Sequence, residues 1–158
     1  MMVASLLKTK LYIPSPRTEL VSRPRLIDRL NVGLHCKLTL VSAPAGFGKT
    51  TLLSEWIHSM ETQYAASLPH AAPPRIAWVS LDKGDNDPAR FWSYCIGALQ
   101  RVQPGIGETA LAALQSRQPP SAEALLTGLI NEIAPIQNPL VLVLDDFHLI
   151  TDQQVPAI

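Results

Sequence analysis

The chain has 158 residues with 13 basic and 13 acidic side chains, so its formal net charge at pH 7 is zero. This balance excludes an overall basic surface for nucleic acid or anionic lipid, so we expect any DNA-binding role to lie outside this sequence. A hydrophobic content of 47% is enough for one folded domain with a core. No apolar run forms a signal peptide or approaches the roughly 20 residues of a membrane span, which predicts a cytoplasmic protein without membrane contacts.

The two cysteines, Cys36 and Cys95, are far apart in the sequence and lie among apolar residues. They form no CxxC pair and have no histidine at the spacing of metal ligands. The sequence therefore predicts two reduced thiols in the core.

Residues 1–21 are predicted to form an extended N-terminal arm, because Pro14 and Pro16 prevent a continuous helix there. Residues 22–158 are predicted to belong to one further domain. Its first element is a short helix, capped by Ser22, with Pro24 in its first turn and its end near Gly33.

Residues 37–42 are predicted to form a buried strand, because they are a short β-prone run that ends before Pro44. From Lys49 to Met60, apolar residues recur at steps of three and four, which predicts an amphipathic helix of about three turns. Residues 61–75 are rich in proline and alanine and are predicted to form a surface loop.

A second strand is predicted at residues 75–81, followed by a turn that contains Asp82, Asp85 and Asp87. Because no glutamate stands at the twelfth position of this run, we interpret these aspartates as turn formers and helix caps rather than as a calcium loop. Asp87 followed by Pro88 is a typical helix start.

Two more helices are predicted, at residues 109–115 and from Ser121 onward. The aliphatic run at residues 140–144 is typical of a central parallel strand that is covered on both faces. Strands that alternate with helices predict a layered α/β fold.

The strongest chemical signal is the run APAGFGKT at residues 43–50, which fits the pattern A/G-x-x-x-x-G-K-[ST] of phosphate-binding loops. A chance match occurs in roughly one chain of this length in a hundred, and the position between a predicted strand and a predicted helix makes chance a poorer explanation still. Gly46 and Gly48 allow several backbone N–H groups to approach a triphosphate. Lys49 is expected to contact the β and γ phosphates, Thr50 to coordinate Mg²⁺ and Thr51 to contact the α phosphate. The predicted nucleotide-binding residues are Ala43, Pro44, Ala45, Gly46, Phe47, Gly48, Lys49, Thr50 and Thr51.

A second signal is the pair Asp145 and Asp146, which follows the aliphatic run at the edge where open α/β sheets bind ligands. The pair is predicted to supply a Mg²⁺ ligand, Asp145, and a catalytic group that orients or deprotonates water, Asp146. Taken alone, a strand followed by an acidic turn explains the two residues equally well. Arg23 and Arg25 are expected to form a solvated charged face more readily than to contact nucleotide.

Several longer runs resemble the MalT-like, LuxR-type ATP-dependent transcription regulators. They are LKTKL (7–11), PSPR (14–17), LVSRPRL (20–26), LTLVSAPAGFGKTTLLSEW (38–56), WVSLDKGDNDPARFW (78–92) and LVLDDFH (142–148). The resemblance implies a three-layer α/β/α P-loop NTPase fold with a parallel sheet, here incomplete at its C-terminal end. It also implies that ATP with Mg²⁺ favours an active, self-associating state, which hydrolysis resets.

The same resemblance implies that promoter DNA is bound by a C-terminal helix-turn-helix that this chain lacks, and that a helical-repeat segment senses the inducer. Hydrolysis by this piece alone is expected to be weak or absent, since groups that position water and stabilise charge would be missing. Two alternatives stay open: a self-sufficient P-loop ATPase or kinase, and an inactive, truncated reading frame. The preference for ATP over GTP rests on the resemblance.

Overall fold

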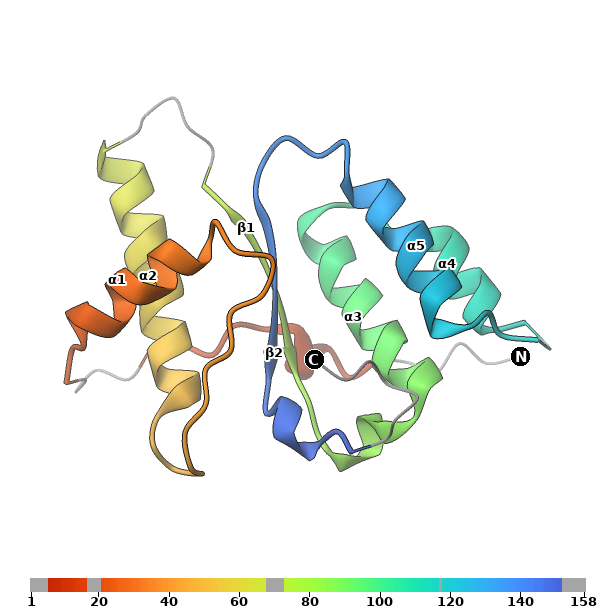
Figure 1. Cartoon of the computed structure of the whole chain (residues 1–158), viewed down its shortest axis with the longest axis horizontal. Helices are drawn as coiled ribbons and strands as arrows, with labels where there is room; N and C mark the ends of the chain where they lie inside the picture. Colours follow the sequence, from red (N-terminus) through yellow and green to blue (C-terminus); the bar gives the residue numbers. More distant parts are fainter. Residues whose placement is uncertain (1–5, 17–20, 68–72, 117, 152–158) are drawn as a thin grey trace. The chain divides into compact units, whose positions relative to one another are not determined.

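The computed structural model describes residues 6–16, 21–67, 73–116 and 118–151 (Figure 1). The chain divides into two compact units. Ile13–Pro74 form the first, here called the loop unit, and Met1–Tyr12 with Arg75–Ile158 form the second, here called the sheet unit. No helix within the described ranges is long and apolar enough to cross a membrane.

The loop unit contains two helices, α1 (Pro24–Gly33) and α2 (Lys49–Ser67). Pro24 stands in the first turn of α1 as predicted, but the N-cap is Arg23 rather than Ser22. The helices pack through apolar faces, and the indole Nε1 of Trp56 donates to Asn31 Oδ1 at 2.9 Å. The buried residues of these two faces are Ile27, Leu30, Leu52, Trp56, Ile57 and Met60.

Helix α2 is longer than predicted, because it continues to Ser67 through residues that were expected to form a loop. Of the rest of that expected loop, residues 68–72 lie outside the described residues, Pro73 and Pro74 have no regular secondary structure, and Arg75 begins the next strand. This part of the chain contains alanine, glutamate and glutamine, which favour helix. Helix α2 therefore continues beyond the predicted amphipathic stretch, although no apolar stripe is required there.

The strand predicted at residues 37–42 is wrong. Residues 38–44 have no regular secondary structure, and the side chains of Leu38 and Leu40 are 59% and 77% exposed. A strand forms only where its N–H and C=O groups pair with a neighbouring strand. The described part of the loop unit contains no strand that could supply this pairing.

The sheet unit is built on two parallel strands, β1 (Arg75–Ser80) and β2 (Leu140–Asp145). Their register pairs Arg75 with Leu140 and Ser80 with Asp145. Three helices, α3 (Pro88–Val102), α4 (Glu108–Leu114) and α5 (Ala122–Ile133), connect them and lie on one side of the sheet in Figure 1. This arrangement confirms an α/β architecture with a parallel sheet.

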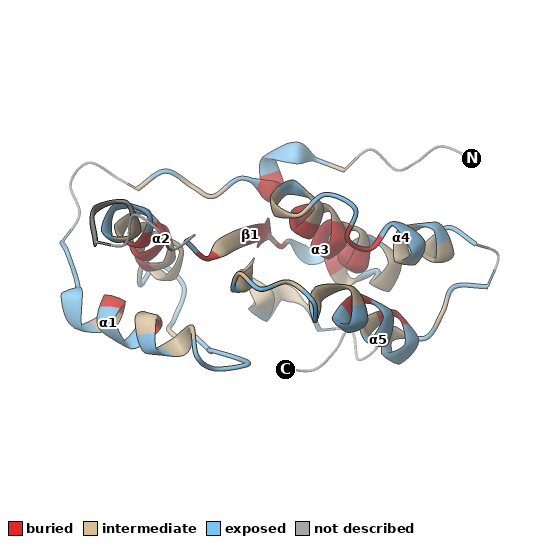
Figure 2. Cartoon of the chain, turned by 90° about the horizontal axis from the view of Figure 1, so that it is seen from above, coloured by how far each residue is buried: buried red, intermediate tan, exposed pale blue. Residues whose placement is uncertain are grey.

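The helices of the sheet unit begin where the sequence predicted. Asp87 Oδ1 accepts from Arg90 N at 2.8 Å at the start of α3, and Ser121 Oγ accepts from Ala124 N at 3.2 Å at the start of α5. Figure 2 shows that the buried residues gather along α3 and β1, where Trp78 and Trp92 are 1% and 7% exposed. The core therefore lies between the sheet and α3, next to α4 and α5.

The N-terminal arm contributes one short element to the sheet unit, the 3-10 helix η1 (Lys8–Leu11). Leu11 is 8% exposed and belongs to the core. Residues 13–16 have no regular secondary structure, in keeping with their prolines, and residues 17–20 lie outside the described residues.

One prediction for the thiols is also wrong. Cys95 is buried in α3, but Cys36 is exposed. It directly follows the turn that ends α1, and the strand expected after it does not form.

Candidate functional site

Residues 43–48 form a loop that leads directly into α2. Gly46 and Gly48 have φ angles of 81° and 77°, a left-handed region that side chains other than glycine rarely adopt. Phe47 N donates to Pro44 O at 3.4 Å within the loop, and Leu52 N donates to Gly48 O at 2.9 Å at the helix start. A glycine-containing loop before a helix N-terminus is an arrangement that favours anions, because N–H groups and the helix dipole act together.

The ammonium group of Lys49 folds back over this loop. Its Nζ donates to the carbonyl oxygens of Ala43 at 2.9 Å and of Pro44 at 3.2 Å. The positive charge therefore lies at the loop itself rather than in bulk solvent. Thr50 and Thr51 follow in the first turn of α2, half-buried.

A second cation also lies at the loop. Arg23 Nη1 donates to Phe47 O at 3.4 Å, and it lies 3.9 Å from the point that a Cβ on Gly48 would occupy. The sequence predicted a solvated charge for Arg23. No local pattern could indicate a bond between this side chain and Phe47, which is 24 positions later. Arg25 is exposed, in keeping with its expected charged surface.

The carboxylate pair lies at the carboxyl end of β2. Asp145 is 5% exposed, while the side chain of Asp146 is 45% exposed. Asp146 has a φ of 57°, the one positive value among the non-glycine residues that the structure describes, and its N–H donates to Asp145 Oδ1 at 3.1 Å. Aspartate adopts this conformation more readily than most residues, and such backbone outliers gather at functional sites.

His148 lies beside this pair on the 3-10 helix η3 (Phe147–Leu149). Its Nδ1 is 3.7 Å from Asp146 Oδ1, and its side chain is 56% exposed. At this distance and exposure the histidine is a neighbour of the carboxylate rather than a strong partner of it.

The carboxylates at the end of β2 fit a magnesium ion in their chemistry. Asp145 and Asp146 offer oxygen atoms only, which are the ligands that Mg²⁺ prefers, and in the loop unit the hydroxyl of Thr50 is a ligand of the same class. Among the described residues no group of three or more His, Cys, Asp and Glu side chains is placed to hold a metal. Mg²⁺ does not require such a group, because it is commonly held by one or two carboxylates together with phosphate oxygens.

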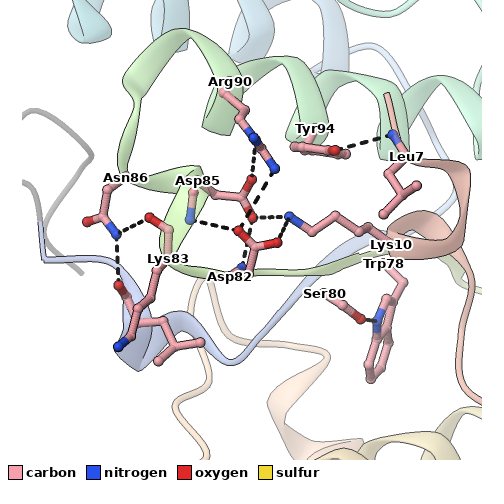
Figure 3. Close-up of polar contacts among 12 residues, drawn as sticks. Leu7, Lys10, Trp78, Ser80, Asp82, Lys83, Asp85, Asn86, Arg90 and Tyr94 are labelled. Carbon is pink, nitrogen blue, oxygen red and sulfur yellow. Dashed lines mark hydrogen bonds and ion pairs between the residues drawn. The ribbon is translucent and has the colours of Figure 1, made fainter. Parts of the chain in front are cut away.

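Next to the carboxyl end of β1 lies a cluster of charges that the sequence did not reveal (Figure 3). Asp85 is 0% exposed, yet its carboxylate bonds Lys10 Nζ and lies 2.9 Å from Arg90 Nε. Lys10 Nζ is also 3.0 Å from Asp82, and the hydrogen bond from Lys10 holds the pKa of Asp82 below its ordinary value. Two cations thus compensate one fully buried carboxylate, as a buried charge requires.

Tyr94 completes this cluster from α3. Its ring centroid is 4.4 Å from Lys10 Nζ, and its hydroxyl accepts from Leu7 N at 3.2 Å. The pattern of the sequence could not indicate these contacts, because Asp85 is 75 positions after Lys10 and Tyr94 is 87 positions after Leu7.

The turn between β1 and α3 confirms the structural role predicted for its aspartates. It is the 3-10 helix η2 (Lys83–Asn86), in which Gly84 N donates to Asp82 Oδ1 at 2.7 Å and Asp82 N to Asp85 Oδ2 at 2.8 Å. Asp82 and Asp85 form a capping box, which fixes the start of this turn.

No family model matches the chain. The chain is 38% identical, over 147 residues, to the HTH-type transcriptional regulator MalT of Cronobacter sakazakii (strain ATCC BAA-894). The match covers 93% of this chain but only 15% of that protein, so the chain spans a small part of its relative's length. The resemblance to the MalT-like, LuxR-type regulators is thereby confirmed along nearly the whole of this chain.

Proposed function

We propose that this chain is the ATP-binding part of a nucleotide-dependent switch in a transcription regulator of the MalT kind. The observation that carries the proposal is the loop of residues 43–48 before α2, with its two left-handed glycines and the ammonium of Lys49 on its carbonyl groups. The relative bears the name of a transcriptional regulator and extends well beyond this match. DNA binding through a helix-turn-helix therefore belongs, in this proposal, to segments other than this one.

In this proposal residues 22–158 belong to a P-loop NTPase domain of three layers, preceded by the arm of residues 1–21. The backbone of residues 43–51 binds the phosphates, and Lys49 contacts the β and γ phosphates. Thr50 and Asp145 hold Mg²⁺, which supplies charge neutralisation at the phosphates. Asp146 orients a water molecule, because its carboxylate is half-exposed beside the buried Asp145.

The consequence for the whole protein is a regulatory cycle. ATP binding favours an active state that associates with other copies, and hydrolysis returns the protein to its resting state. We place this cycle in the cytoplasm, where a regulator of transcription meets DNA. The chain alone is expected to bind nucleotide but to turn it over weakly.

The first test measures Mg²⁺-dependent binding of a fluorescent ATP analogue to the purified chain and to Lys49→Ala. A charge-assisted hydrogen bond contributes about 1.5–3 kcal/mol, so the substitution is expected to weaken binding by about 10- to 100-fold. Lys37→Ala is the matched control, because Lys37 is an exposed lysine of the same unit that lies outside residues 43–51. The control should bind as tightly as the unchanged chain.

Equal binding by Lys49→Ala and the unchanged chain would show that the loop does not hold the phosphates. A folded chain that binds no nucleotide would likewise contradict the proposal. Steady release of phosphate at enzymatic rates, about 1 per second or faster, would instead favour a self-sufficient ATPase or kinase.

A further inference from the structure

The side-chain amide of Asn86 bonds the segment that follows the aspartate pair. Its Oδ1 accepts from Thr151 N at 2.7 Å and from Thr151 Oγ1 at 3.2 Å. Its Nδ2 donates to Leu149 O at 2.9 Å and to Lys83 O at 3.0 Å (Figure 3). The amide presents a donor and an acceptor together, so it pairs with the carbonyl of Leu149 and the N–H of Thr151 much as a neighbouring strand would.

The segment that Asn86 bonds, Leu149 to Thr151, is joined to the aspartate pair by a short turn with its own backbone hydrogen bonds. Leu149 N donates to Asp146 O at 3.0 Å, and Ile150 N donates to Phe147 O at 3.0 Å. On the other side of the pair, Leu81 N donates to the backbone oxygen of Asp145 at 3.0 Å. The turn that presents Asp145 and Asp146 is therefore held at both of its ends by the strand-to-helix connection after β1.

Asn86 is itself well anchored, because it ends η2. The preceding residue, Asp85, is fully buried between Lys10 and Arg90. Because the turn is fixed, the side chain of Asn86 has a fixed position, and its hydrogen bonds fix the position of the segment that it bonds. The N-terminal arm, through Lys10, thus contributes to the support of the carboxylate turn.

We propose that Asn86 is a positioning residue, which fixes the turn carrying Asp145 and Asp146 for a divalent cation. The inference rests on the proposed function, in which Asp145 is a ligand of Mg²⁺. Groups that orient a metal ligand without touching the metal typically change metal affinity by about 10- to 100-fold when they are removed. Loss of the Asn86 amide would leave nucleotide contacts intact and weaken the contribution of Mg²⁺.

The test titrates Mg²⁺ against the fluorescent ATP analogue on the full chain, with a parallel measurement in a metal chelator. In Asn86→Ala, the Mg²⁺ concentration for half-maximal binding is expected to rise about 10-fold, while metal-free binding stays within about twofold. Amide hydrogen exchange at residues 146–151 should also become faster without nucleotide, since the turn loses its outer anchor.

Gln100→Ala is the matched control. Gln100 Nε2 donates to Ile106 O at 2.9 Å, which is the same kind of bond in the same unit but away from the carboxylates. This variant should keep the Mg²⁺ requirement of the unchanged chain. A rise in Mg²⁺ requirement that Gln100→Ala shares would reflect general loosening and would overturn the role of Asn86.

Thr151→Pro attacks the same bond from its other end, because proline has no N–H to donate. The preceding Ile150 has φ of −88° and ψ of 114°, close to the region that a residue before proline prefers. This variant should raise the Mg²⁺ requirement in the same direction, and it decides the question if Asn86→Ala fails to fold by circular dichroism.

The experiment distinguishes failure of the inference about Asn86 from failure of the proposed function. If the unchanged chain binds nucleotide and both variants keep its Mg²⁺ requirement within about twofold, the inference about Asn86 is overturned and the nucleotide site stands. If the unchanged chain shows no Mg²⁺-dependent binding, the proposed function falls and the role of Asn86 falls with it.

Discussion

The two thiols of the chain lie in opposite environments. Cys36 is exposed, whereas Cys95 is 1% exposed within α3. Burial raises the pKa of the Cys95 thiol to about 12, because a thiolate would lose its hydration there. Since the thiolate is the reactive form, the two residues should differ strongly in reactivity.

A thiol reagent at pH 8 is expected to modify one cysteine per folded chain, at Cys36. Cys95 should react only after the chain is unfolded in guanidinium chloride. Mass spectrometry of the digested protein locates the label, and Cys36→Ala, which should take up no label when folded, is the control. Rapid labelling of Cys95 in native buffer would contradict the burial of α3.

Single residues also show where sequence reasoning ends. The capping roles of Asp82 and Asp87 could be predicted, because the groups that they bind lie two or three positions away. The burial of Asp85 could not, because its cations come from the arm and from the following helix. The glycine and lysine pattern of residues 43–49 likewise predicted a phosphate-binding loop. It could not predict that Arg23 donates a hydrogen bond to this loop.

Among the elements, the start of α4 depends on a single glycine. Gly107 is the N-cap, with a φ of 70°, and its N–H donates to Glu132 Oε2. A Cβ at this position would lie 2.6 Å from Ile96 Cγ2 and 3.0 Å from Leu129 Cδ2, both in the core. Substitution therefore combines backbone strain with steric overlap.

Gly107→Ala is expected to lower the free energy of unfolding by about 2–4 kcal/mol, from the cost of a left-handed alanine and of overpacking. Gly105→Ala is the matched control, because Gly105 also has a positive φ, 92°, but no atom lies within 4 Å of its added Cβ. Its expected cost is only the backbone strain, about 1–2 kcal/mol. Urea denaturation measures both, and equal losses would show that the contact with Ile96 does not matter.

The elements that the sequence predicted well are those whose signals are local. The starts of α3 and α5 follow from capping residues that bond within their own first turn. Strands β1 and β2 were recognisable from apolar runs, and they do find each other as partners. Residues 37–42 carry a similar run but have no strand partner in the described part of their unit, which composition alone cannot reveal.

At the scale of the whole molecule, the loop unit leaves several large apolar side chains in solvent. Val32, Leu38, Leu40 and Phe47 are between 59% and 77% exposed. Three of these, Leu38, Leu40 and Phe47, lie at positions 38–47 of the sequence, which include or directly precede the candidate phosphate-binding loop. Large apolar side chains that are exposed close together along the chain favour association.

The purified chain is therefore expected to self-associate at micromolar concentrations, and Leu40→Lys to shift it towards monomer by removing the most exposed of these side chains. Sedimentation velocity over a concentration series measures the shift. Val21→Lys is the control, because Val21 is 83% exposed but lies outside residues 32–47. A monomer at every concentration, or an equal shift in Val21→Lys, would count against association through this region.

The ion pair between Lys10 and Asp85 also constrains the order in which parts of the protein can fold during translation. Ribosomes add about 5–20 residues per second, so Asp85, which is 75 positions after Lys10, is added about 4–15 s later. Throughout that interval Lys10 lacks the buried carboxylate with which it pairs in the folded protein, whereas residues 13–74, which form the loop unit, are all made. The sheet unit can close only after β2 has been made, so η1 (Lys8–Leu11) is one of the last described elements to reach its final place.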